Sequence, residues 1–480
     1  MLFVYAAISK LLDFENFKIQ LGQSPILSPY AMYFAWGVPI IELILAFLLL
    51  FNSCKIIGLL GSYIMMVLFI IYIYILLHHS SFLPCSCGGV LERMNWNEHL
   101  IFNFTFLVLA VFGILFLTKK RIIILLLLST PFLGFAFLWA LFQVSENKIE
   151  SQNPFVRQFP PKLATYINQT SIEFNSYYFA GYGNGTIYLG NYTAPLHVLE
   201  IDTTLHIKRK ITIDLDIKAN RTLYRKLQLR VLPPYFYLMD GTVPLLHQGF
   251  ISNWKINKTV HDSPFFTLIE PMDSISLAIR SNSSKNGKNQ LGIFSLHHLL
   301  TSKMNPDLLK KHPSSDGIFD TEGTLLYSTQ QSLVLYVNRY TNDYVVADKQ
   351  LNAVYRGKTI DTISTPQIKI VKQKNERKMS APPLIVNPTA AVYDNLLFVN
   401  SNLRGRYDAF KTWKSASTID VYDITKKIYL FSFYINSYDD KKLKSFYITD
   451  SYLFAIIDNQ LVRYQLSENV IEKMKSTIIK

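Results

Sequence analysis

Residues 122–142 read IIILLLLSTPFLGFAFLWALF, an apolar stretch without a single charged side chain. A helix of this length crosses a hydrocarbon core of about 30 Å. Three earlier stretches, residues 31–51, 56–77 and 100–118, are also long and apolar enough to cross. The sequence therefore predicts a bundle of four membrane-spanning helices.

A fifth apolar stretch, residues 1–12, is too short to span unaided. Two interpretations stay open: a short N-terminal helix that is half buried in the bundle, or a span whose first residues have been lost from the start of the chain. A cleaved signal peptide is not expected, because no charged region precedes this stretch and no small-residue cleavage site follows it.

The composition changes near residue 145, where short alternating runs rich in Tyr, Thr, Asn and Lys replace the apolar stretches. Residues 1–145 hold seven Lys/Arg and five Asp/Glu, so +12 of the net charge of +14 belongs to the rest of the chain. The basic clusters, at residues 208–210 and 369–378, are separated by neutral strands and lack the aromatic spacing of a nucleic-acid platform. They indicate either a solvated surface or attraction to anionic lipid headgroups, and no nucleic-acid partner is expected.

The basic turn Lys119-Lys120-Arg121 between the last two spans is the strongest orientation signal, and Lys55 agrees with it. Basic residues on short loops prefer the cytoplasmic side. Threading the chain from these anchors places residues 78–98 and everything after residue 142 on the outer side. We therefore expect a multi-pass protein of the bacterial inner membrane with its C-terminal domain in the periplasm, where disulfides are permitted.

The loop at residues 83–89, LPCSCGG, places two thiols one residue apart. The third cysteine, Cys54, is also in the membrane half, so the second half cannot depend on disulfides. Cys85 and Cys87 are close enough to exchange a disulfide, and redox exchange is the favoured interpretation. Two alternatives stay open, namely a metal site completed by histidines (His78, His79 or His99) and inert structural cysteines.

Three polar residues are expected inside or at the edge of the spans. Glu42 lies within the first span, where a carboxylate is costly unless it faces the bundle interior. It is a candidate for proton handling, for pairing with Lys10, or for clamping helices together. His99 and Asn103 begin the third span one helical turn apart and so share a face. His99 is either a proton carrier during thiol exchange or an interfacial anchor.

Four segments together resemble the MauE family of methylamine utilisation proteins, which is grouped with the DoxX-like membrane proteins: residues 5–14 with Phe17, residues 39–42, residues 84–89, and residues 96–100 with Asn103. The resemblance covers about residues 1–142. It implies a four-helix bundle similar in plan to quinone-linked thiol oxidoreductases of the DsbB and vitamin K epoxide reductase type, with a quinone as cofactor. The family is linked to production of a disulfide-rich dehydrogenase subunit; we carry over its thiol site and not its pathway. The first family helix is shortened in this chain.

Beyond a linker expected at residues 143–170, strand-like stretches recur every 40 to 50 residues up to residue 480. Each mixes β-branched and aromatic residues in period-two runs, with turns such as Asn184-Gly185 and Asp240-Gly241 between them. This spacing is typical of four-stranded β-propeller blades. Six blades fit best, seven are an alternative, and a pair of β-sandwiches is a further alternative.

Two functions are consistent with this organisation. The first is a membrane thiol-disulfide oxidoreductase with Cys85, Cys87, His99 and Glu42 as site residues, assisting the maturation of an exported protein that the propeller holds. The second is a non-enzymatic, membrane-anchored receptor or assembly factor whose propeller binds a peptide, glycan or protein. The second is motivated by the lack of catalytic spacing among His, Asp and Glu in the outer domain.

Overall fold

The computed structural model describes residues 2–14, 17–18, 21, 24, 26–27, 30–79, 96–149, 155–215, 224–243, 245–261, 263–296, 303–309, 317–373 and 376–475. The chain divides into two compact units, which are described separately. The first unit comprises Met1–Ser151 and Gln367–Leu384, and the second comprises Gln152–Pro366 and Ile385–Lys480.

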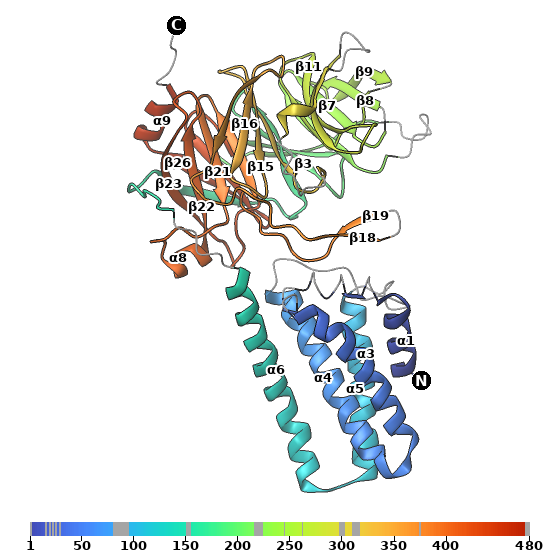
Figure 1. Cartoon of the computed structure of the whole chain (residues 1–480). Helices are drawn as coiled ribbons and strands as arrows, with labels where there is room; N and C mark the ends of the chain where they lie inside the picture. The colour runs from blue at the N-terminus through green and yellow to red at the C-terminus, as the bar shows by residue number, and fades with distance from the viewer. Residues whose placement is uncertain are drawn as a thin grey trace. The chain divides into compact units, whose positions relative to one another are not determined.

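The first unit is a bundle of apolar helices (Figure 1). The helices are α1 (Leu2–Leu12), α3 (Ala31–Leu50), α4 (Lys55–His79), α5 (Trp96–Leu117) and α6 (Arg121–Ile149). The last four are long and apolar enough to cross a membrane, which confirms the predicted spans, whereas α1 has only 11 residues. The four long helices alternate in direction, so the C-terminal ends of α4 and α6 lie at the same end of the bundle as the start of α5.

Helix α4 is central to the bundle, because it packs against α3, α5 and α6. A glycine permits its close approach to α3: a Cβ at Gly61 would lie 2.3 Å from Cδ2 of Leu45. The hydroxyl of Tyr63 on α4 donates to the carbonyl oxygen of Leu127 on α6 at 2.7 Å. Small residues and hydrogen bonds of this kind drive helix association in lipid, where the hydrophobic effect between helices is absent.

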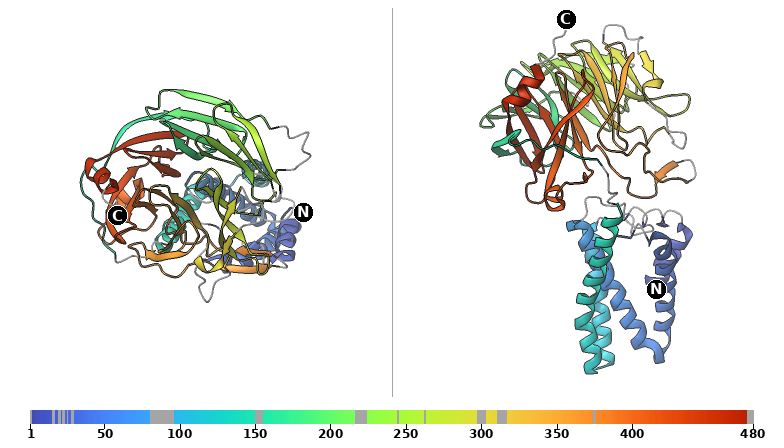
Figure 2. Two further views of the ribbon diagram at one scale, coloured as in Figure 1. Left: turned by 90° about the horizontal axis from the view of Figure 1, so that it is seen from above. Right: turned by 60° about the vertical axis from the view of Figure 1, so that its left-hand side comes forward.

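The second unit consists of six four-stranded antiparallel sheets arranged in a ring (Figure 2). The described strands thus confirm the predicted propeller and its preferred number of blades, rather than seven blades or a pair of sandwiches. Blades 1 to 3 contain β2 (Tyr177–Gly183), β3 (Thr186–Asn191), β4 (His197–Asp202) and β5 (Lys208–Thr212); β6 (Leu227–Leu232), β7 (Tyr235–Asp240), β8 (Leu245–Phe250) and β9 (Lys255–His261); and β10 (Leu268–Pro271), β11 (Ser276–Asn282), β12 (Asn289–Ser295) and β13 (Lys303–Asn305).

Blades 4 to 6 continue the same meander. They contain β14 (Gly323–Ser328), β15 (Leu333–Asn338), β16 (Asp343–Ala347) and β17 (Ala353–Lys358); β20 (Thr389–Tyr393), β21 (Leu396–Ser401), β22 (Ala416–Asp423) and β23 (Ile428–Asn436); and β24 (Ser445–Ile448), β25 (Tyr452–Ile457), β26 (Gln460–Leu466) and β1 (Ala164–Ser171). The first strand of each blade adjoins the first strand of the next, so these six strands line the axis.

The core of the propeller lies between neighbouring blades. The middle strands of a blade are covered on both faces, and every residue of β21 and β22 is buried. Strands buried in this way read as nearly continuous apolar runs. Between blades 5 and 6, for example, Phe398, Phe433 and Phe446 belong to one buried cluster. Each such side chain contributes roughly 1.5–3 kcal/mol when it leaves water.

Strand β1 closes the ring. It pairs antiparallel with β26, from Ala164 opposite Leu466 to Ser171 opposite Gln460. The sixth blade therefore takes three strands from the end of the domain and its outermost strand from the beginning. β1 overlaps the end of residues 143–170, the segment expected to be a linker. The sequence did not indicate this strand, because pairing between strands so distant in sequence leaves no local signal.

Four short elements lie outside the blades. They are η4 (Pro306–Leu308), α8 (Phe410–Ser415), α9 (Glu468–Lys475) and the hairpin of β18 (Ile370–Gln373) with β19 (Glu376–Met379). The hairpin is inserted between blades 4 and 5 and groups with the first unit rather than with the propeller. A further 3-10 turn, η2 (Asn52–Cys54), joins α3 to α4.

Before β1, residues 155–159 run as a strap along blade 5. The carbonyl oxygen of Gln158 accepts from the Ser432 amide at 2.8 Å. The guanidinium of Arg157 is fully buried; its Nε lies 2.7 Å from Oδ1 of Asp420, and its Nη1 pairs with Asp408. Burial alone would lower the pKa of Arg157, but Asp420 and Asp408 hold the pKa above its usual value. The strap is therefore fixed by a buried cation with two carboxylates.

We expect Arg157→Ala to lower the free energy of unfolding of the propeller by about 3 kcal/mol, because two buried carboxylates lose their counter-charge. Urea unfolding of the detergent-solubilised full chain, followed by tryptophan fluorescence, measures the loss. Arg209→Ala is the matched control: Arg209 pairs with Glu200 at 3.0 Å but its side chain is 67% exposed. The control should lose less than about 1 kcal/mol. Equal losses in the two variants would contradict the role of the strap.

Candidate functional site in the helical bundle

A buried ion pair joins the short helix α1 to the first spanning helix. Lys10 lies in the last turn of α1, and its Nζ donates to Oε1 of Glu42 on α3 at 2.7 Å. The two side chains are only 11% and 2% exposed. Lys10 also lies 5.8 Å from the ring centroid of Phe17. The pairing with Lys10, one of the roles expected for Glu42, is thus present.

One oxygen of Glu42 is left open. Its Oε2 is buried and has no hydrogen-bond partner within the part of the chain that the structure describes. A buried carboxylate oxygen without a donor is costly, so this atom is suited to accept a hydrogen bond from a bound group.

The side chain of His99, on the first turn of α5, presents a hydrogen-bond donor, whereas Glu42 presents an acceptor. Nδ2 of Asn103 lies 3.3 Å from Nδ1 of His99, as their spacing of one helical turn predicts. When Nδ1 accepts this hydrogen bond, a neutral imidazole carries its proton on Nε2. That Nε2 is buried and, among the described residues, has no partner. The site therefore offers one open acceptor, on Glu42, and one open donor, on His99.

Both atoms belong to residues that line a single cavity of about 340 Å³ inside the bundle. This volume is in the range of pockets that hold small organic ligands. The walls are mostly apolar and aromatic, and the polar side chains of Lys10, Glu42, His99 and Asn103 gather in it. Wall residues from all five helices include Phe3, Phe34, Met66, Trp96, Phe102 and Leu138. The cavity thus has the character of a site for an apolar molecule with a polar head.

Cys85 and Cys87 lie outside the described residues. The described residues nearest to them in sequence are His79, at the end of α4, and Trp96, at the start of α5. Trp96 lines the cavity. Cys54 is described and is not in a disulfide. It precedes α4, a helix about 37 Å long, and so lies at the opposite end of this helix from His79.

No described group of three or more His, Cys, Asp and Glu residues is arranged to hold a metal ion. Of the three histidines considered as ligands, His78 is exposed, and its Nδ1 lies 3.1 Å from the Tyr74 carbonyl oxygen. The side chain of His79 lies outside the described residues. The metal alternative therefore gains no support from the described part of the bundle.

The axis of the propeller carries a second polar group. The phenol of Tyr447 interacts electrostatically with Glu270, Tyr182 and Tyr393, which come from three other blades. Side chains from such distant blades meet only at the axis. Glu270 lies 3.5 Å from Nε of Arg230, and both side chains keep part of their exposure, 32% and 22%. Burial raises the pKa of Glu270, and Arg230 opposes the rise. Arg230 and Glu270 were not among the site residues expected from the sequence. The signal that could have indicated them is a charged residue within an otherwise apolar inner strand.

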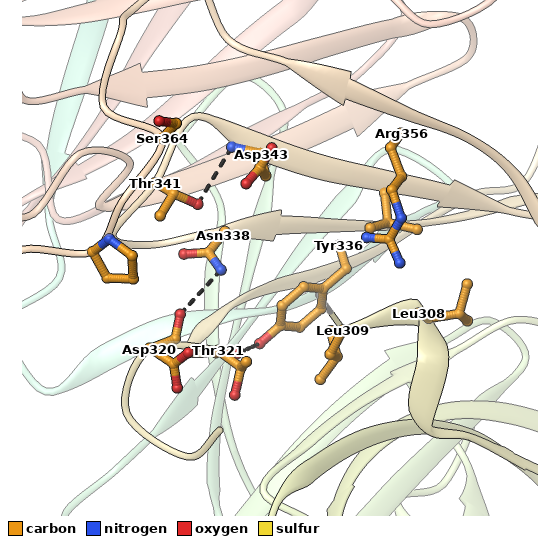
Figure 3. Close-up of a pocket in the computed structure, with 12 residues that line it drawn as sticks. Leu308, Leu309, Asp320, Thr321, Tyr336, Asn338, Thr341, Asp343, Arg356 and Ser364 are labelled. Carbon is orange, nitrogen blue, oxygen red and sulfur yellow. Dashed lines mark hydrogen bonds between the residues drawn. The ribbon is translucent and has the colours of Figure 1, made fainter. Parts of the chain in front are cut away.

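A smaller hollow lies in blade 4, beside η4 (Figure 3). Its volume is about 40 Å³, which is room for a few water molecules rather than a substrate. The polar side chains around it bond within the blade: the Tyr336 hydroxyl donates to the Thr321 carbonyl at 2.7 Å, and Nδ2 of Asn338 donates to the Asp320 carbonyl at 3.2 Å. This hollow is part of the blade architecture.

Comparison with solved structures gave matches at low similarity. A member of the DUF4221 family from Bacteroides vulgatus is 12% identical, covers 67% of this chain and 99% of its own, and has a TM-score of 0.40. Hsv2 from Kluyvelomyces marxianus is 10% identical, with 58% of this chain and 74% of its own covered and a TM-score of 0.31. A nidogen/laminin complex is 12% identical, with 52% and 76% covered and a TM-score of 0.31.

No curated protein matched the chain significantly. A family model did match, over residues 1–116, and this range contains α1, α3, α4 and nearly all of α5. Its description is methylamine utilisation protein MauE. It includes Lys10, Glu42, His99, Asn103 and the cysteine loop. The chain thus joins a membrane region that is similar to the MauE family to a six-bladed β-propeller.

Proposed function

We propose that the bundle is a thiol-disulfide redox module that passes electrons from an exported dithiol protein to a quinone in the membrane. The observation that carries the proposal is that two buried polar atoms without a described partner, the acceptor Oε2 of Glu42 and the donor Nε2 of His99, belong to residues that line the same cavity. A quinone head presents carbonyl oxygens when oxidised and hydroxyls when reduced. A protein donor suits a carbonyl oxygen of the oxidised form, and a protein acceptor suits a hydroxyl of the reduced form.

The exchange step uses Cys85 and Cys87. A thiolate of the exported partner attacks one sulfur of the Cys85–Cys87 disulfide, forms a mixed disulfide and releases the other cysteine as a thiolate. The second thiol of the partner then attacks the mixed disulfide. The partner leaves with a disulfide, and Cys85 and Cys87 keep two electrons and two protons as a dithiol.

Reoxidation of the dithiol releases two electrons and two protons, and a quinone supplies the chemistry that accepts them. The residues of the chain would hold its head: His99 Nε2 would donate to a carbonyl oxygen, and Glu42 Oε2 would accept from a hydroxyl. Lys10 Nζ lies 2.7 Å from Oε1 of Glu42 and so occupies that oxygen, which leaves Oε2 for the ligand. The apolar walls exclude water and suit the isoprenoid-like part of such a ligand.

We further propose the bacterial inner membrane as the location, with the cysteine loop and the propeller in the periplasm. The basic turn Lys119-Lys120-Arg121 at the other end of the bundle supports this orientation. The C-terminal end of α6 lies at the same end of the bundle as the ends that flank the loop. The propeller would position the exported partner.

Redox trapping in native membranes tests the thiol step. In a Cys54→Ala background, we expect Cys85 and Cys87 to resist maleimide before reduction and to take two labels after it, because their resting form is a disulfide. Mass shift on a gel measures the labels. A Cys85→Ser variant should leave Cys87 free, with one label before reduction. Two labels at all times in the unaltered loop would refute the redox function.

Quinone binding tests the cavity independently of the thiols. We expect a short-chain quinone to quench tryptophan fluorescence saturably, since Trp96 lines the cavity. His99→Phe keeps a ring but removes the donor, and should raise the Kd about tenfold, equivalent to about 1.4 kcal/mol. His78→Phe, at an exposed histidine of α4, is the matched control and should leave the Kd unchanged. Equal affinity in both variants would contradict the assigned head position.

The second candidate is a membrane-anchored receptor. The observation that favours it is the polar group at the propeller axis, where Arg230, Glu270 and three tyrosines are available to a ligand. Replacing both loop cysteines by serine separates the candidates. The redox function predicts loss of the partner's disulfides, whereas a receptor keeps its cellular function in that variant.

A further inference from the structure

The loop between β21 and β22, residues 402–415, combines cationic and aromatic side chains and contains α8. We call it the basic-aromatic loop. It holds four cationic residues and one carboxylate. Arg406, Lys411 and Lys414 are exposed, and Tyr407 and Phe410 are 73% and 45% exposed. Aromatic rings beside Lys and Arg are typical of segments at a membrane interface.

The one carboxylate of this loop does not neutralise its outer surface. Asp408 is only 3% exposed and pairs with the buried Arg157. The positive charges of the basic-aromatic loop therefore face outward, while its negative charge is used inside the propeller.

A second cationic segment is inserted in the connection that leads into blade 5. Residues 367–384, which include the β18–β19 hairpin, contain five Lys/Arg and one Glu. Just after the insertion, the carbonyl oxygen of Val386 accepts a hydrogen bond at 2.9 Å from the amide of Asn402, the first residue of the basic-aromatic loop. The end of the insertion and the start of this loop therefore lie next to each other.

The strands explain why these segments share one face of the ring. Strands alternate in direction within a blade, so the loop between its second and third strands and the connection to the next blade lie at the same end. The basic-aromatic loop joins the second and third strands of blade 5, and the hairpin insertion lies in the connection from blade 4 to blade 5.

The opposite end of the ring has no such excess. Its described turns are residues 184–185, 203–207, 233–234, 251–254, 272–275, 329–332, 348–352, 394–395, 424–427 and 449–451. Together they hold three lysines and four aspartates. With three positive and four negative charges, these turns carry a net charge of −1, whereas the basic-aromatic loop, with four positive charges and one negative charge, carries +3.

The chain arrives from the membrane on the same face. The amide of Arg406 donates to the carbonyl oxygen of Phe155, at the start of the strap, at 2.9 Å. The apolar part of α6 ends at Phe142, and the helix itself ends at Ile149. Helix rise and an extended chain together reach at most about 30 Å between Phe142 and Phe155. The tether therefore limits the distance between Phe142 and the point at which Arg406 contacts the strap to about this length.

We propose that the basic-aromatic loop is a membrane-docking surface of the propeller that binds anionic phospholipid headgroups. Each cation near an anionic surface contributes about 1 kcal/mol, and the attraction falls off over a Debye length of about 10 Å. Tyr407 and Phe410 add apolar contact at headgroup level. Because the tether makes docking intramolecular, weak contacts suffice to hold this face on the membrane.

Hydrogen exchange of the full chain in lipid nanodiscs, read out by mass spectrometry over residues 402–415, tests the proposal. We expect exchange at least about tenfold slower in discs containing phosphatidylglycerol than in phosphatidylcholine discs, with the difference lost at high salt. The triple variant Arg406→Glu/Lys411→Glu/Lys414→Glu should abolish the difference. Lys349→Glu/Lys426→Glu/Lys427→Glu, which reverses three exposed lysines at the opposite end, is the matched control and should retain it.

The other outcomes each overturn the proposal. Equal exchange in both lipids and in detergent means that lipid does not cover the loop or that protein already covers it. Protection that appears only with two copies per disc assigns the surface to a second copy of the chain. Protection by inorganic phosphate in phosphatidylcholine discs identifies a free anion as the ligand.

Unchanged exchange of β22 in the triple variant verifies that blade 5 remains folded.

Discussion

The ion pair between Lys10 and Glu42 is the constraint on which the membrane unit depends. A carboxylate in the middle of an apolar span costs several kcal/mol unless it is paired. Helix α1 is too short to cross a membrane, and the pair fixes it against α3 all the same. Since only one oxygen of Glu42 is needed for Lys10, the other remains available. The same interaction therefore holds the helix in place and supplies the acceptor of the candidate site.

The propeller depends on a different constraint, the closure of the ring by β1. Without β1, β26 would expose the edge of the last blade, and open edges invite pairing with other chains. Because β1 comes from the start of the domain, the chain must run along blade 5 before it reaches its place. Arg157 holds it on this path. The position at which the propeller is tethered thus follows from how its ring closes.

Local patterns in the sequence were sufficient for some of these features. Hydropathy located the four spans, helical spacing placed His99 beside Asn103, and regular turn spacing gave six blades. The features that were not predicted depend on contacts between distant residues. β1 pairs with a strand almost 300 residues away, Arg157 finds partners in blade 5, and the cavity volume results from the packing of five helices. No short window of sequence contains such information.

Chain connectivity relates the two units through the end of α6 and the strap. Four spans that alternate in direction return the chain, at the end of α6, to the end of the bundle at which α4 ends and α5 begins. Within the propeller, the described chain begins at Phe155, at the end of the ring that carries the basic-aromatic loop. The proposed chemistry of the bundle and the proposed recognition by the propeller therefore require only that both units face the same side of the membrane.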